Sequence, residues 1–232
     1  MKTGRGVWAH REGYPGGMLT LHTTPVSANG RKPLAVGRHL GLDLDVRTVD
    51  VYRGEGQAPG YRALNPWGKV PTLVDGDFVL WESNAILVYL SEAHGGFALS
   101  SHEPGERANI LRWMFWEASH WQPTLTRVLA PRAAQVLFPA AGAEVARVAW
   151  EDKELETLLG FLDATLQAGP FLCGKALTLA DFSVAGMTTY FRVTGFPGER
   201  YPAVAAWTRR LDELPAWAST LVDPWRDGSE AS

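Results

Sequence analysis

The sequence predicts an α/β domain followed by an all-helical domain. Before about residue 95, short β-prone runs alternate with segments that carry helix signals. A tight Asp-Gly turn joins two of these runs. Beyond about residue 105, apolar residues recur at helical spacing over long segments. A chain of 232 residues has room for two domains of modest size.

The first half begins with a strand, a helix and a second strand. Residues 18–23 alternate between apolar and polar side chains, which predicts a strand. A polar turn over residues 24–30 leads into residues 31–41, which we interpret as a helix that ends at a glycine. Residues 44–49 alternate again as a second strand, and a short helix is expected over residues 60–64.

A hairpin and a third helix follow. Residues 70–74 and 78–81 are β-prone runs separated by Asp-Gly-Asp at residues 75–77, and glycine tolerates the positive φ that such turns require. Glu-Ser-Asn at residues 82–84 precedes an apolar run, which is typical of a helix start. The resulting order, βαβαββα, is that of a thioredoxin-like domain.

A redox domain of that fold would carry Cys-x-x-Cys. The turn here reads Ser-Ala-Asn-Gly at residues 27–30, and the chain contains one cysteine, Cys173. Dithiol chemistry and an intramolecular disulfide are therefore excluded. We interpret Cys173 as a small buried apolar residue, and a single cysteine suits a reducing cytoplasm.

The second half is predicted to be helical. Beyond residue 105, one amphipathic stretch runs from residue 110 to about residue 128, and another runs over residues 145–166. Further on, Thr178 and Asp181 have the spacing of a capping box, in which the carboxylate of Asp181 reaches back to the Thr178 N–H. We assign this pair a structural role.

Shifts in composition suggest the domain limits. We expect a disordered N-terminal extension over residues 1–17 and the thioredoxin-like domain over residues 18–94. Residues 95–104 contain Gly and Pro, which is typical of a linker. The all-α domain would then cover residues 105–220, and residues 221–232 would form a tail.

Composition and motifs narrow the classes of partner. A formal charge of −3 provides no electrostatic footprint for nucleic acid. There is no apolar run of 18 residues, and residues 1–17 lack the apolar core of a secretory signal. No set of His, Cys, Asp and Glu has metal-ligand spacing, and no phosphate-binding loop appears. We therefore expect a small-molecule partner, with no metal, nucleic acid or membrane.

Two segments carry a family resemblance. Residues 65–71 read Asn-Pro-Trp-Gly-Lys-Val-Pro, and residues 81–86 read Trp-Glu-Ser-Asn-Ala-Ile. Together with the turn near residue 27, they resemble the cytosolic glutathione S-transferases, a likeness that covers roughly residues 18–220. The resemblance implies glutathione as co-substrate, an electrophilic and mostly hydrophobic second substrate, a cytoplasmic homodimer and a role in detoxification.

The resemblance places the group that contacts the glutathione sulfur in residues 27–32 (Ser-Ala-Asn-Gly-Arg-Lys). This segment is similar to the serine-type turn of theta- and phi-like members, in which Ser27 would be the catalytic hydroxyl. It is also similar to the Asn-Gly-x-Lys turn of nu-class bacterial members, in which Asn29 would share the role. The alternative is that Ser27 only caps the helix.

Typical energies give the size of the change that such a hydroxyl would make to the pKa of a bound thiol. A free cysteine thiol has a pKa of about 8.5. Hydrogen bonds to charged groups are worth roughly 1.5–3 kcal/mol, and one pKa unit corresponds to about 1.4 kcal/mol. One well-placed hydroxyl would therefore lower the thiol pKa by about one to two units. No general base is then needed at neutral pH.

The resemblance also implies contacts to the rest of glutathione. The backbone of Val70 would pair with the cysteinyl part, particularly if the bond to Pro71 is cis and turns that backbone outward. Lys69, and with it Gln57, would reach the glycyl carboxylate. At the γ-glutamyl end, Glu82 would face the ammonium group and Ser83 the carboxylate. These six positions are the predicted glutathione contacts.

The pocket for the electrophile is expected along the first long helix. The resemblance places Trp113 and Trp116 along this pocket, and His120 is a candidate proton donor. The alternative is that these rings simply pack in the core.

Two other functions remain open. One is a glutathione-dependent disulfide oxidoreductase of the nu type, which the Asn-Gly turn favours. The other is a non-catalytic binding module that keeps the glutathione fold. The missing cysteine at the turn favours conjugation, with Ser27 as the first candidate and Asn29 as the second.

Overall fold

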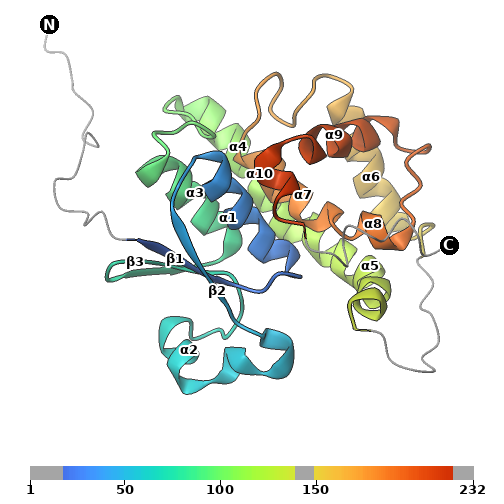
Figure 1. The fold of residues 1–232 in the computed structure, drawn as a ribbon. Helices are drawn as coiled ribbons and strands as arrows, with labels where there is room; N and C mark the ends of the chain where they lie inside the picture. The colour runs from blue at the N-terminus through green and yellow to red at the C-terminus, as the bar shows by residue number, and fades with distance from the viewer. Residues whose placement is uncertain (1–17, 139–148, 222–232) are drawn as a thin grey trace, which may run out of the picture.

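The computed structural model describes residues 18–138 and 149–221 (Figure 1). The expectations for residues 1–17, 145–148 and 222–232 lie outside these ranges. The first half contains a four-stranded sheet with the strand order β2-β1-β3-β4. β1 runs parallel to β2 and antiparallel to β3, and β4 forms a hairpin with β3. The strands are β1 (Leu19–Thr23), β2 (Leu44–Thr48), β3 (Thr72–Asp75) and β4 (Phe78–Trp81).

Helices lie on both sides of this sheet. α1 and α3 cover the side that faces the helical half of the molecule, and α2 lies on the other side (Figure 1). Short 3₁₀ turns η1 and η2 precede α2, and a π-helical turn, η3, follows α3. The bounds are α1 (Ala28–His39), η1 (Val51–Arg53), η2 (Glu55–Gln57), α2 (Pro59–Leu64), α3 (Ser83–Tyr89) and η3 (Leu90–His94). The predicted thioredoxin-like order is confirmed.

The helical half surrounds one buried helix. Every residue of α7 (Leu179–Thr188) is buried, and this helix packs against both α1 and α4. The remaining elements are α4 (Pro104–Trp116), the π-helical turn η4 (Glu117–Trp121), α5 (Gln122–Leu137), α6 (Lys153–Leu166), α8 (Phe191–Thr194), α9 (Pro202–Asp212) and α10 (Pro215–Ala218).

Three predicted helix limits were wrong. α1 begins at Ala28 instead of residue 31, because Ser27 caps it earlier than the polarity of the turn suggested. The helix expected over residues 110–128 begins earlier, at Pro104, and continues to Leu137 through η4. The helix expected from residue 145 begins, in the described part, only at Lys153, where the Asp152 carboxylate accepts from Glu154 N and Leu155 N.

The predicted capping pair at α7 is confirmed. Asp181 Oδ2 accepts a hydrogen bond from Thr178 N at 2.9 Å. Asp181 Oδ1 accepts two more, from Leu172 N at 2.9 Å and from Trp207 Nε1 at 3.0 Å. The carboxylate therefore joins three separate segments around the start of the buried helix.

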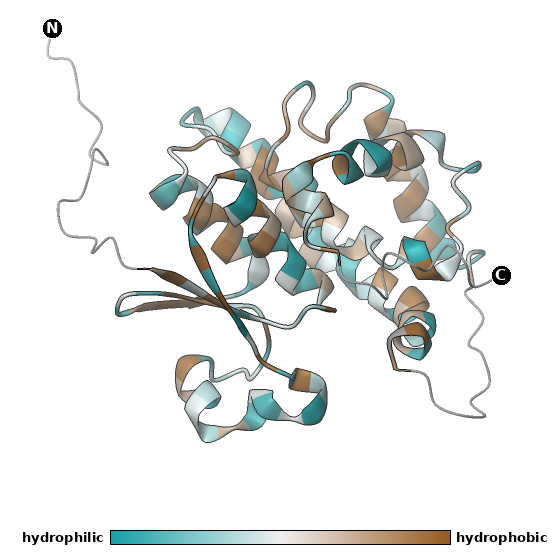
Figure 2. Ribbon diagram, viewed as in Figure 1, coloured by the Kyte–Doolittle hydropathy of each residue, from teal (hydrophilic) through white to brown (hydrophobic). Residues whose placement is uncertain are grey.

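One hydrophobic core runs through both halves. It includes Leu21 and Val36 of the sheet domain together with Phe182 and Trp207 of the helical half. Brown segments, which mark hydrophobic residues, recur on the helices of both halves (Figure 2). Within the described ranges, no helix is both long and apolar enough to cross a membrane.

Candidate functional site

Strand register brings three predicted loops to one edge of the sheet. His22, next to the end of β1, pairs with Thr72 at the start of β3. Thr72 in turn pairs with Trp81 at the end of β4. The turn that follows β1, the Val-Pro step that precedes β3 and the segment that follows β4 therefore meet at the same edge.

Ser27 caps α1 and keeps a donor free. Its Oγ accepts a hydrogen bond from Gly30 N at 3.0 Å, which satisfies one of the helix N–H groups. A hydroxyl also carries one hydrogen that it can donate. Ser27 Oγ donates to no group of the described residues. Capping and contact with a sulfur are thus compatible roles for this side chain.

The side-chain oxygen of Asn29 is unpartnered. The residue is partly buried in the first turn of α1, and its Oδ1 is buried without a hydrogen bond within the described part of the chain. Buried amide oxygens are normally paired. The amide next to Ser27 therefore has bonding capacity left for a ligand.

The Val70–Pro71 bond is cis, as considered from the sequence. The preceding carbonyl, Lys69 O, accepts hydrogen bonds from Tyr61 Oη at 2.6 Å and Asn65 Nδ2 at 2.8 Å. Both side chains also reach Thr72 Oγ1. Burial raises the pKa of Tyr61, so its hydroxyl stays protonated. This clamp was not predicted, although Asn65 lies inside the family-like segment.

Gln57 and Lys69 are both exposed and both lie next to Gly68, Lys69 in the sequence and Gln57 in space. Gly68 has φ +68, and a Cβ at that position would lie 2.6 Å from Gly56 O and 2.8 Å from Gln57 Nε2. Only glycine fits this close approach. The predicted pair for the glycyl carboxylate is therefore brought together.

Glu82 and Ser83 directly follow β4, at the same edge of the sheet. Glu82 is exposed and has φ +73, a conformation that non-glycine residues seldom adopt. Strain of this kind is concentrated at ligand-binding sites. Ser83 is only 8% exposed, and its hydroxyl makes no hydrogen bond to the described residues.

The predicted aromatic residues are divided between core and surface. Trp113 is 3% exposed, and its ring packs 5.3 Å from Trp116 and 5.5 Å from Phe161. This burial fits the packing interpretation better than a pocket lining. His120 is exposed. The cluster of Trp113, Trp116 and Phe161 lies between α4 and α6, within the helical half.

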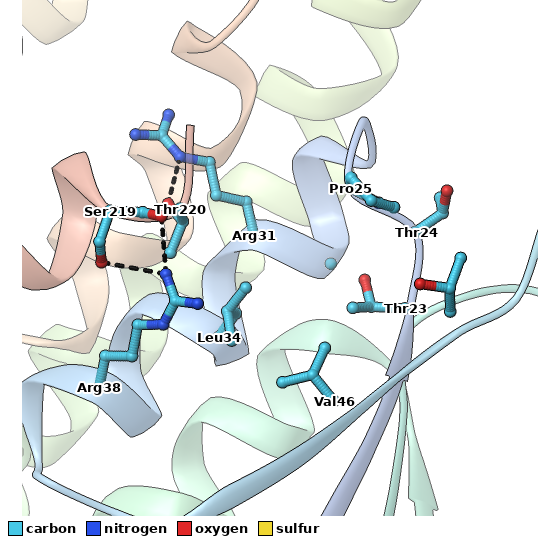
Figure 3. A pocket seen from close by; sticks show the side chains of 11 residues that line it. Thr23, Thr24, Pro25, Arg31, Leu34, Arg38, Val46, Ser219 and Thr220 are labelled. Atoms are coloured by element: carbon cyan, nitrogen blue, oxygen red, sulfur yellow. Dashed lines mark hydrogen bonds between the residues drawn. The ribbon is translucent and has the colours of Figure 1, made fainter. Parts of the chain in front are cut away.

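A cavity of about 200 Å³ lies beside the turn (Figure 3). Its walls come from α1, from β2 and from the chain after α10, and Thr24 and Pro25 connect it to the turn. Arg38 Nη1 donates to Ser219 at its rim. Ser27 and Asn29 do not line it. The sequence could not reveal this cavity, because three distant segments form it.

Arg31 fastens the same turn to the C-terminal helices. Its guanidinium donates to Thr189 Oγ1, Thr220 Oγ1 and Trp217 O and lies 3.7 Å from the centre of the Trp217 ring. Burial lowers the pKa of Arg31 to about 9. The start of α1 is therefore bonded directly to the C-terminal helices.

Comparisons with known proteins agree with this geometry. The family described as "Glutathione S-transferase, N-terminal domain" matches residues 26–93. The family described as "Glutathione S-transferase, C-terminal domain" matches residues 139–210. A curated relative, Glutathione S-transferase D7 of Drosophila melanogaster, is 28% identical over 88% of each chain.

Two solved structures are similar over nearly their whole length. The theta class glutathione S-transferase of Xanthomonas axonopodis pv. citri, with glutathione bound, is 33% identical with a TM-score of 0.76, covering 88% of this chain and 97% of that one. The glutathione transferase URE2P6 of Phanerochaete chrysosporium, in complex with oxidized glutathione, is 31% identical with a TM-score of 0.74, covering 94% and 99%. The chain belongs to the glutathione S-transferases, a family of transferase enzymes.

Proposed function

We propose that this enzyme binds glutathione at the sheet edge, stabilises its thiolate and directs it to an electrophilic, mostly hydrophobic substrate. The observation that carries the proposal is the turn at the start of α1. There the hydroxyl of Ser27 has a hydrogen to donate, and the side-chain amide of Asn29, two residues further on, carries N–H donors. Relatives solved with glutathione or its oxidised form bound support the choice of ligand.

The chemistry follows from the capping bond. By accepting from Gly30 N, the Ser27 oxygen is polarised, so its own hydrogen becomes a better donor to a sulfur anion. A bound thiol would lose its proton to solvent with a pKa about one to two units below the free value. The thiolate then attacks an electrophilic carbon. A carbon–sulfur bond forms, and the leaving group departs with its electron pair.

The other contacts hold the tripeptide in register. We assign the cysteinyl backbone to Val70 beside Pro71, and the glycyl carboxylate to Lys69 with Gln57. Glu82 would pair with the γ-glutamyl ammonium. Ser83 would complete the γ-glutamyl contacts with its unpartnered hydroxyl.

The test is calorimetry with glutathione followed by turnover of an aromatic halide. The Ser27→Ala and Asn29→Ala variants should retain most of their affinity but lose about tenfold or more in kcat. Asp152→Ala is the matched control, because it removes the cap of α6 far from the turn. Wild-type protein without affinity for glutathione would refute the proposal.

A second candidate is glutathione-dependent disulfide reduction. The Asn-Gly sequence at residues 29–30 and a relative solved with oxidized glutathione favour it. Hydroxyethyl disulfide distinguishes the two reactions. Turnover of this substrate alone would favour reduction, and binding without any turnover would favour a non-catalytic module.

We further propose that the enzyme is a cytoplasmic homodimer. Large aromatic side chains stand exposed on the surface, among them Phe115 at 69% and Trp67 at 64%, and burial in an interface would remove them from water. Light scattering after gel filtration should give twice the chain mass. A monomer at micromolar concentration would contradict this.

A further inference from the structure

Lys32 and Glu117 form an ion pair shielded completely from solvent. Lys32 Nζ lies 2.7 Å from Glu117 Oε1, and both side chains are 0% exposed. Lys32 is in α1, and Glu117 begins η4 in the helical half. The two residues are 85 positions apart in the sequence. The pair therefore connects the two halves of the molecule.

The second carboxylate oxygen extends this contact to α3 and α7. Asn84 Nδ2 donates to Glu117 Oε2 at 2.9 Å and to Met114 O at 3.0 Å. Ser183 Oγ donates to Asn84 Oδ1 at 2.8 Å. Lys32, Asn84, Glu117 and Ser183, here called the buried polar network, thus join α1, α3, η4 and α7.

Stability alone is a poor explanation for this network. Taking two charges out of water generally offsets what their pairing returns, and an apolar pair of similar volume is often as stable. Burial lowers the pKa of Lys32, and the neighbouring carboxylate of Glu117 opposes that effect. A Cβ at Gly186 of α7 would lie 2.4 Å from Lys32 Cε, so the lysine stem fits only beside a glycine. The network fixes one specific geometry.

The network holds α1 and α3, and both of these helices carry proposed glutathione contacts. Lys32 lies one turn after Asn29 on α1, the helix that Ser27 caps. Asn84 directly follows Ser83 at the start of α3. Hydrogen bonds to the helical half therefore hold the sulfur end and the γ-glutamyl end of the site at once.

We propose that Lys32 and Glu117 are positioning residues, which set the separation between the Ser27 turn and Ser83 by fixing α1 and α3 against the helical half. This inference rests on the proposed function, because the separation matters only if both ends hold one glutathione. The two residues act through the helices that they anchor. The network thereby keeps the sulfur at a fixed place relative to the γ-glutamyl end.

The test is the double variant Lys32→Met/Glu117→Gln, which removes both charges with little change in volume. The new amide oxygen at position 117 can still accept from Asn84, and no buried charge is left unpaired. We expect a folded protein whose kcat/KM for glutathione falls about tenfold or more. The pKa of the bound thiol, read from ultraviolet absorbance, should rise. Gly186→Ala, which displaces the lysine stem without changing charge, should shift both quantities in the same direction.

Leu159→Ala in α6 is the matched control, because it destabilises the core away from α1 and α3. It should lower the melting temperature while leaving the bound thiol pKa unchanged. A double variant that titrates and turns over like wild type would overturn the proposal. Wild-type protein with no thiolate absorbance would instead refute the proposed function, so the two failures are distinguishable.

Discussion

In the proposed mechanism, single hydrogen bonds decide the chemistry of the site. Ser27 uses its lone pair for the helix and leaves its hydrogen for a ligand, so one side chain can serve both roles considered from the sequence. Tyr61 and Asn65 both hold the carbonyl of Lys69, directly before the Val70–Pro71 step. They orient the backbone that would pair with the cysteinyl part of glutathione.

Tyr61→Phe tests this clamp at the residue scale. It removes the hydroxyl that donates to Lys69 O but keeps the ring, and Asn65 still satisfies the carbonyl. We expect a loss of about 1 kcal/mol in the free energy of unfolding and a higher KM for glutathione. Tyr52→Phe is the control, since Tyr52 is exposed at η1. Unchanged KM values for Tyr61→Phe would show that the clamp does not orient the Val70 backbone.

At the scale of elements, local chemistry was predictable and helix limits were less so. The hairpin, the strands and the capping pair of α7 follow from side-chain alternation, from Asp-Gly and from the spacing of Thr178 and Asp181. The starts of α1 and α6 depend on one capping side chain each, which short polar segments obscure. The buried polar network was beyond prediction, because its residues meet only after the two halves pack.

Asp181→Ala should destabilise the protein more than capping alone suggests. Besides Thr178 N, the carboxylate accepts from Leu172 N and Trp207 Nε1, and these buried donors would lose their partner. We expect a loss of about 3 kcal/mol or more in the free energy of unfolding. Chemical denaturation measures it. A loss of about 1 kcal/mol would mean that the cap is the only bond that matters.

His22 in β1 should make stability depend on pH. Burial, and then the charge of Arg47, lowers its pKa from the ordinary value of 6.5 in the folded state. The unfolded chain therefore binds the proton first, so stability is complete above pH 6.5 and is lost as the pH falls below it. The melting temperature of His22→Gln should fall less on acidification from neutral pH than that of wild type. Equal falls would contradict the assignment, with His120→Gln as an exposed control.

For the whole molecule, the shared core and two buried basic residues of α1, Arg31 and Lys32, make the halves interdependent. Leu21 and Phe182, from different halves, belong to one cluster. Arg31 bonds to the C-terminal helices, and Lys32 bonds to η4. The family and the fold class were recognisable from the motifs near residues 65–86. The cavity beside α1 was not, because it exists only in the assembled chain.

One calorimetric transition should therefore accompany thermal unfolding. Because no boundary divides the core, the sheet domain and the helical half should melt together, with calorimetric and van't Hoff enthalpies in agreement. Two resolved peaks would show that the halves are independent folding units.

Stabilisation of the glutathione thiolate is tested most directly by titrating the thiol of bound glutathione with pH and following its ultraviolet absorbance. For wild type we expect a pKa about one to two units below 8.5, returning toward 8.5 in Ser27→Ala or Asn29→Ala. A bound thiol that titrates like the free tripeptide in the wild-type enzyme would contradict this role for the turn at the start of α1.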